Sequence, residues 1–124
     1  VPGRDPLLAD SASTRVKRRF PAAGEAHRLD LDTSGLMLFA KDPATQRALH
    51  RAFAERAVAK DYAAELVGSV AHDRGDVHLP LRLDLFDRPR QIVDRVQGYP
   101  SHTRFIVTAR SAERTRVVFS PVAP

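Results

Sequence analysis

The chain has 124 residues, a net charge of +5 at neutral pH and a pI of about 10.4. This length allows one domain with a modest core, and the absence of cysteine excludes a disulfide framework and thiolate metal sites. No apolar stretch reaches a membrane-spanning length and no signal-peptide pattern opens the chain, which favours the cytoplasm. Most of the 20 basic residues are arginine, a composition that fits a nucleic-acid partner but also arises from a high-GC genome.

The first predicted element is a short helix over residues 10–20. Asp10 or Ser11 can cap its N-terminus, and Pro21 stops it. The helix carries the densest basic run of the chain, which comprises Arg15, Lys17, Arg18 and Arg19. Such a run forms either a solvated helix face or a surface that meets RNA, and the sequence favours neither.

A polar loop follows at residues 27–35, with the sequence His-Arg-Leu-Asp-Leu-Asp-Thr-Ser-Gly. Asp30 lies between Arg28 and a small hydroxylated turn, whose donors can keep the carboxylate ionised and oriented. Gly35 allows a backbone turn that other residues disfavour, so a short buried strand is predicted over residues 36–40. Asp30 is therefore a candidate catalytic residue, with a plain turn or cap aspartate as the alternative.

A second helix is predicted from Pro43 to about Ala57, with Asp42 as its cap. Its apolar stripe comprises Ala44, Ala48, Leu49, Ala52 and Phe53. The residues predicted to face water are Gln46, Arg47, His50, Arg51 and Glu55.

Alternating apolar and polar residues predict strands over residues 62–67, 77–85, 103–110 and 115–120. Pro80 places the second of these at a sheet edge or a bulge, and the last two form a hairpin. Residues 69–76 are predicted to be a hydrophilic connection, and residues 97–102 a turn cluster. The predicted fold class is α+β, a mixed and mainly antiparallel sheet with flanking helices, in a single domain over residues 1–124.

The stretch His-Arg-Leu-Asp-x-x-Thr-Ser-Gly, followed by an apolar strand, resembles the signature of the RluA-type pseudouridine synthases. A passage containing Lys60 and Tyr62 also resembles that family, as does the Arg-Pro-x-Gln of residues 88–91, with Asp87 in place of the family's asparagine. This last passage leans towards the short RluA-like enzymes that act on both rRNA and tRNA. The resemblance implies the pseudouridine synthase catalytic fold, an RNA stem-loop substrate, no cofactor, and isomerisation of uridine to pseudouridine.

The same resemblance implies roles for individual residues. Asp30 corresponds to the family's catalytic aspartate, acting either as a nucleophile or as a base on the sugar. Arg28 would enter the space left by the flipped base, and Tyr62 would stack on the uracil. The alternatives are that Arg28 only braces Asp30 and that Tyr62 is a core residue. Lys60 would also bind substrate, and His27 is expected to hydrogen-bond the loop.

Other chemistries fit less well. Asp30 and Asp32 are too close in sequence to act from opposite sides of a glycosidic bond, as the carboxylates of a glycosidase do. Ser34 lacks the Gly-x-Ser-x-Gly elbow of a serine hydrolase. His72 and His78 are loosely spaced and no third ligand is evident, so the sequence predicts no metal site.

The resemblance covers only the middle of the family's catalytic domain. An opening strand would precede Val1, and Ala123 and Pro124 stand where the family has the threonine and glycine of a Thr-Gly-Arg-x-His-Gln motif. The basic residue of that motif pairs with the catalytic aspartate. We therefore expect a catalytic domain truncated at both ends. It is an RNA pseudouridine synthase or, alternatively, a catalytically impaired RNA-binding remnant of one. We also expect it to be a monomer.

Overall fold

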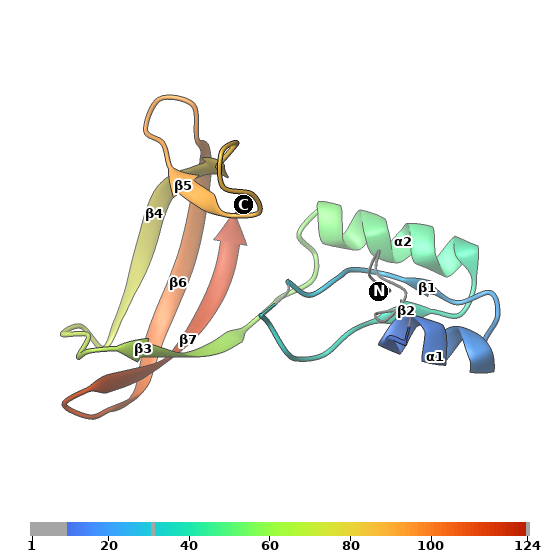
Figure 1. The fold of residues 1–124 in the computed structure, drawn as a ribbon, viewed down its shortest axis with the longest axis horizontal. Coiled ribbons are helices and arrows are strands. Elements are labelled where there is room, and N and C mark those ends of the chain that lie inside the picture. The colour runs from blue at the N-terminus through green and yellow to red at the C-terminus, as the bar shows by residue number, and fades with distance from the viewer. Residues whose placement is uncertain (1–9, 31, 124) are drawn as a thin grey trace. The chain divides into compact units, whose positions relative to one another are not determined.

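The computed structural model describes residues 10–30 and 32–123, which form two helices and seven strands (Figure 1). Val1, Leu31 and Pro124, to which some of the sequence predictions refer, lie outside the described residues. The chain divides into two compact units, Val1–Val58 and Ala59–Pro124, and each is described by itself. All strand pairs of the described residues are antiparallel, which confirms the predicted α+β class.

The first unit contains helix α1 (Ala12–Arg19), strands β1 (Gly24–Glu25) and β2 (Phe39–Ala40), and helix α2 (Pro43–Ala54). The Ser11 hydroxyl caps α1 and the Asp42 carboxylate caps α2, each accepting a backbone N–H from three residues further on. Both caps confirm the prediction, although α2 ends at Ala54 rather than Ala57. Neither helix of the described residues has the length and hydropathy that a membrane span requires.

The predicted buried strand over residues 36–40 is mostly wrong. Only Phe39 and Ala40 form β2, which pairs with the two residues of β1, and Leu36 is 94% exposed. The ladder continues for one more bond, from the Ala26 N–H to the Leu38 carbonyl oxygen. A strand needs a neighbour for its backbone donors and acceptors, and β1 is too short to supply them to the whole apolar run.

The face of α2 that meets β1 is more polar than predicted. Gln46 Nε2 donates to the Glu25 carbonyl oxygen at 3.0 Å, and His50 Nε2 donates to the same oxygen at 2.9 Å. Ala44 and Ala48, which belong to the predicted apolar stripe, are exposed. The helix therefore contacts the end of β1 by side-chain hydrogen bonds, which helical periodicity does not reveal.

The second unit is a five-stranded sheet in the order β3-β7-β6-β4-β5 (Figure 1). Its strands are β3 (Tyr62–Val67), β4 (Arg74–Leu83), β5 (Gln91–Val93), β6 (Tyr99–Arg110) and β7 (Arg114–Ala123). The predicted strand over residues 62–67 and the predicted hairpin, now β6 and β7, are confirmed. Both β4 and β6 begin earlier than predicted, because their ladder extends from the pair Arg74–Ile106 to the pair Leu81–Tyr99.

Pro80 and Thr108 occupy contrasting positions in this sheet. Pro80 lies in the part of β4 that pairs only with β6 among the described strands, since β5 begins its pairing opposite Leu81. The predicted edge position or bulge is wrong, because β4 lies between β6 and β5, its pairing with β6 is regular at Pro80, and the Pro80 carbonyl oxygen accepts a hydrogen bond from the Asp94 N–H at 3.0 Å. Thr108 is an extra residue of β6, because Val107 pairs with Val117 and Ala109 pairs with Arg116, the neighbour of Val117 on β7. This extra residue is a β-bulge.

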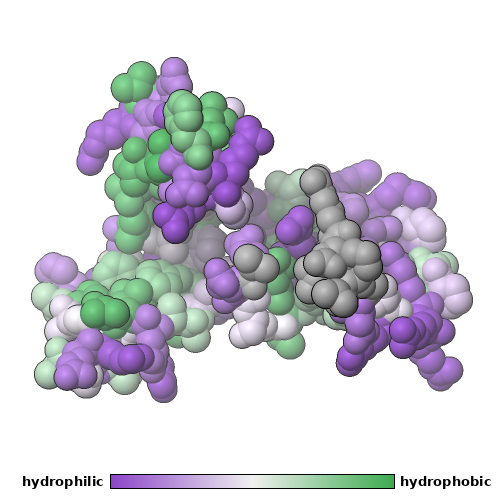
Figure 2. Space-filling model, viewed as in Figure 1, coloured by the Kyte–Doolittle hydropathy of each residue, from purple (hydrophilic) through white to green (hydrophobic). Residues whose placement is uncertain are grey.

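Few side chains of the sheet unit are buried. Among its described residues only Thr115 and Val117 are, and both lie on β7, the strand between β3 and β6. Phe86 and Val96 are almost completely exposed, and Figure 2 shows hydrophobic residues, in green, at the surface of this unit. The stability of the sheet unit therefore depends on a small number of buried groups and on its ladders.

Candidate active site

The motif loop, residues 27–35, connects β1 to β2 within the first unit. His27 Nε2 accepts a hydrogen bond from the Leu38 backbone N–H at 3.1 Å, so its neutral ring carries the proton on Nδ1. The His27 ring also packs against Phe53 of α2, with ring centroids 4.8 Å apart. The predicted structural role of His27 is confirmed, since it links both ends of the loop to each other and to α2.

Arg28 and Asp30 lie on this loop with exposed side chains. A backbone turn follows the aspartate, in which the Thr33 N–H donates to the Asp30 carbonyl oxygen at 3.1 Å. Gly35 has φ of 145°, a conformation that favours glycine, as predicted. No ion pair among the described residues involves the Asp30 carboxylate. The loop therefore presents a guanidinium and a carboxylate to solvent, two residues apart.

Lys60 and Tyr62 lie in the second unit, at the start of β3. Tyr62 is 39% exposed and pairs with Phe119 of β7. Asp61 lies between them, and its carboxylate accepts a hydrogen bond of 2.5 Å from the Ser120 hydroxyl of β7. Arg28 and Asp30 thus lie on one loop of the first unit, and Lys60 and Tyr62 lie at the start of β3 in the second unit.

Charged side chains help to hold β3 against β7. Glu65 on β3 accepts hydrogen bonds from Arg116 at 3.0 Å and from Arg114 at 3.1 Å, both on β7. These two guanidinium groups, with Arg116 the stronger influence, lower the pKa of the Glu65 carboxyl. The three side chains are exposed, so each ion pair adds little stability, but together they favour the observed register of the strand that begins with Tyr62.

The basic run of α1 is partly neutralised within the first unit. Arg15 forms an ion pair with Asp10 at 2.6 Å, and Lys17 lies 3.5 Å from the Glu25 carboxylate. Glu25 also accepts a short hydrogen bond from the buried Ser13 hydroxyl, which is the main reason that its pKa is lowered. Lys17 and Ser13 therefore connect α1 to β1, and the two ion pairs use two of the four basic residues.

One of the two remaining basic residues of α1, Arg19, lies close to an aromatic ring. Arg18 and Arg19 are exposed and form no ion pair among the described residues. The Arg19 guanidinium lies 5.9 Å from the centre of the Phe20 ring, and the Lys41 ammonium lies 5.1 Å from it. This cluster combines phosphate-binding cations with an exposed aromatic side chain, which are two features of nucleic-acid surfaces.

Residues 12–122 match the family model described as RNA pseudouridylate synthase. The chain belongs to this family. The dual-specificity RNA pseudouridine synthase RluA of Haemophilus influenzae is 45% identical over 123 residues, which are 98% of this chain and 56% of that protein. The RluA protein of Escherichia coli K12 is 41% identical with the same coverage. The chain therefore spans little more than half the length of these curated synthases.

Two solved synthase structures are similar to this chain. Human RNA pseudouridylate synthase domain containing 1 has a TM-score of 0.76 and 26% identity, over 90% of this chain and 50% of that one. Human RNA pseudouridylate synthase domain containing 4 has a TM-score of 0.70 and 22% identity, over 96% and 48%, and supports the fold alone. The predicted family and its catalytic fold are confirmed, and the single domain over residues 1–124 stays a prediction.

One group of metal-ligating side chains was not predicted from the sequence. Asp76, His78 and His102 come together on the ladder of β4 and β6. Asp76 lay in a predicted connection and His102 in a predicted turn cluster, so neither was expected on the sheet. The sequence showed only that Asp76 and His78 are two residues apart, which places them on one face if both belong to a strand.

Proposed function

We propose that this chain carries the central part of the catalytic domain of an RNA pseudouridine synthase, which isomerises uridine to pseudouridine in structured rRNA or tRNA. The observation that supports this proposal is the family match over residues 12–122, which includes the whole motif loop. Relatives named dual-specificity RNA pseudouridine synthases, at 41–45% identity, support more than one RNA substrate, and the choice of rRNA and tRNA rests on the sequence resemblance. The whole protein's activity is part of the proposal, because the chain spans only 56% of those relatives.

In the proposed reaction, the N-glycosidic bond of a uridine breaks, the uracil turns, and its carbon five joins the ribose; the hydrogen on carbon five leaves to solvent as a proton, and the freed nitrogen takes up a proton, so the product is an isomer. Asp30 is the proposed catalytic residue, with its carboxylate acting on the sugar or the base as nucleophile or as general base. Its position on an exposed turn leaves it accessible to a large RNA substrate. The residues that we propose for this chemistry need no cofactor or metal.

A base inside an RNA hairpin has to leave its stack before a carboxylate can reach its sugar, at a cost of a few kcal/mol. We assign Arg28 to the space that the base leaves, because its guanidinium is exposed and planar and can stack on the neighbouring bases. Tyr62 is assigned to the extruded uracil, since its ring is partly exposed on a strand whose register is held by Glu65. Lys60, also exposed, is assigned to the substrate backbone.

Binding of the RNA would also use cations outside the motif loop. The group of Arg19 and Lys41 is the strongest candidate, because both cations lie close to the exposed Phe20 ring, and the exposed Arg18 adjoins them in sequence. Each phosphate neutralised by such a cation releases counterions, so binding would weaken steeply as salt rises. A monomeric state and a cytoplasmic location stay predictions.

The test is tritium release from an RNA stem-loop labelled at carbon five of uridine. It uses the 124-residue chain and the whole protein that contains it, each as wild type, Asp30→Asn and Asp32→Asn. Asp32 is the matched control, because it is an exposed carboxylate on the same loop without a proposed catalytic role. We expect release by the whole protein to fall at least about 1,000-fold in Asp30→Asn and to stay within about threefold of wild type in Asp32→Asn.

The same RNA is used to measure binding by filter retention at several salt concentrations. Salt-dependent binding by a whole protein that releases no tritium would favour the RNA-binding remnant over the enzyme. Equal tritium release from wild type and Asp30→Asn would remove Asp30 from the mechanism. A protein with neither binding nor release would contradict the proposed function.

A further inference from the structure

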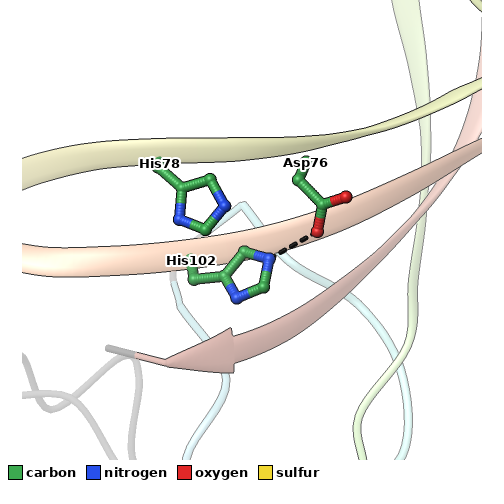
Figure 3. Close-up of side chains that lie close together, drawn as sticks. All are labelled: Asp76, His78 and His102. Carbon is green, nitrogen blue, oxygen red and sulfur yellow. Dashed lines mark hydrogen bonds and ion pairs between the residues drawn. The ribbon is translucent and has the colours of Figure 1, made fainter.

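Three side chains on one face of the sheet unit form a cluster of metal-ligating groups. His78 on β4 and His102 on β6 are directly opposite each other in the ladder, and Asp76 precedes His78 by two residues. Side chains two apart on a strand, and directly opposite across an antiparallel pair, lie on the same face. Figure 3 shows all three side chains close together on that side of the two strands.

The imidazole rings and the carboxylate are already in mutual contact. The two rings stack with centroids 4.0 Å apart and an angle of 19° between their planes. His102 Nε2 donates to Asp76 Oδ1 at 2.5 Å. One ligand atom from each of the three residues lies within 4.8 Å of the other two.

These distances are close to those of a metal site. A tetrahedral Zn²⁺ with ligand bonds of 2.0–2.1 Å holds its ligand atoms about 3.3 Å apart. The three ligand atoms lie within 4.8 Å of one another, and the ladder holds the two strands that carry them side by side, so metal binding would draw the side chains together by rotation. The side chain of Asp76 is 50% exposed and that of His102 is 23% exposed, so an ion from solvent can reach this partly buried group of ligands.

We propose that Asp76, His78 and His102 bind one divalent transition-metal ion of the Zn²⁺ type, with the remaining coordination positions open to solvent. Two imidazoles and one carboxylate suit zinc and its neighbours, whereas Mg²⁺ and Ca²⁺ require sets of oxygen ligands. The carboxylate offsets part of the charge of the ion. Arg104, the cross-strand partner of Asp76, opposes the cation, but its side chain is exposed and its charge is screened.

The competing explanation is a surface ion pair between His102 and Asp76 that binds no metal. The two explanations assign different roles to His78, which is a ligand in the metal site and only a stacking neighbour in the ion pair. His78→Ala therefore distinguishes them. His72 supplies the matched control, since it is an exposed histidine of the same unit outside the cluster.

The experiment is calorimetric titration of Zn²⁺ into the 124-residue chain without RNA, so its outcome is independent of the proposed catalytic function. We expect one Zn²⁺ per chain, a loss of affinity of at least about tenfold in His78→Ala, His102→Ala and Asp76→Asn, and unchanged binding in His72→Ala. Mg²⁺ at the same concentrations should give no binding. Far-UV circular dichroism checks that each variant folds. If His102→Ala does not fold, His78→Ala still tests the proposal, because the side chain of His78 is exposed and its removal should not disturb the fold.

A wild-type chain that binds no Zn²⁺ at millimolar concentration would overturn the proposal. Affinity in His78→Ala equal to that of wild type would do the same and leave the ion pair as the explanation. An equal loss in His72→Ala would show that zinc binds surface histidines without a defined site, which also contradicts the proposal.

Discussion

Thr115 is the buried polar side chain on which the connection after β3 depends. Its hydroxyl donates to the Gly68 carbonyl oxygen at 2.7 Å and accepts from the Val70 N–H at 3.0 Å. Thr115 itself is fully buried, at 0% exposure. The substitution Thr115→Val keeps the shape of the side chain and removes both hydrogen bonds, so it isolates their contribution.

The expected cost follows from these contacts. Two backbone groups lose their partner, and each costs about 1–1.5 kcal/mol, the low end of the usual range, because Gly68 and Val70 are half-exposed and reach some water. The new methyl group gains about 0.8 kcal/mol of burial. We therefore expect Thr115→Val to lower the free energy of unfolding by about 1.2–2.2 kcal/mol.

The assay is urea denaturation of the 124-residue chain, followed by circular dichroism. Thr115→Ser keeps the hydroxyl and should lose only about 1 kcal/mol for its buried methyl group. Thr108→Val removes an exposed hydroxyl with a long contact of 3.3 Å, so it should change stability by less than about 0.5 kcal/mol. A Thr115→Val chain as stable as wild type would refute the assignment of stability to these hydrogen bonds.

Three further outcomes are expected. Asp42→Ala removes the cap of α2 and should cost about 1 kcal/mol in urea denaturation, whereas Asp42→Ser should retain most of the stability. Val117→Ala removes two fully buried methyl groups and should cost about 2 kcal/mol, against less than about 0.5 kcal/mol for Val67→Ala, whose side chain is 97% exposed. Hydrogen bonds from Arg82 and two backbone N–H groups lower the pKa of Asp94 from 3.8 to about 2, so the stability from its charge is full above about pH 5 and is lost as the pH falls towards 2. The melting temperature of Asp94→Asn should therefore lie below that of wild type at pH 6 and approach it near pH 2; a constant difference would contradict the assigned pKa.

Local sequence patterns predicted the elements whose signals are local. The caps Ser11 and Asp42 fixed the starts of both helices, since a cap depends only on residues within one turn. The strand that starts at Tyr62 and the hairpin of β6 and β7 followed from alternation and a polar turn. Gly35 and His27 were also assigned correctly, because both roles belong to one loop.

Predictions failed where a distant segment decides the outcome. Leu36 is exposed because the extent of β2 depends on the short partner β1, which no local pattern indicated. The polar side chains of Gln46 and His50 bond to Glu25, a residue of another element. His102 belongs to the sheet because β6 pairs with β4 as far as Tyr99, through residues 99–102, whose types are common in turns.

The candidate active-site residues were found through the family motif rather than through physical reasoning alone. Arg28, Asp30, Lys60 and Tyr62 have ordinary local surroundings: each is exposed, and no ion pair of the described residues involves them. A carboxylate with catalytic function and a carboxylate in a turn look alike until the substrate is present. The spacing of the motif therefore carries information that neither hydrophobic pattern nor charge supplies.

Thr108 gives the hairpin of β6 and β7 an unusual tolerance of length. Removing one residue from a regular strand turns every later side chain to the opposite face of the sheet. Removing Thr108 would instead join Val107 directly to Ala109, and each would keep its present partner on β7. Deletion of Thr108 would therefore leave the side chains before and after it on the faces of the sheet where they now lie, so β6 could become one residue shorter without reversing which side chains face inward.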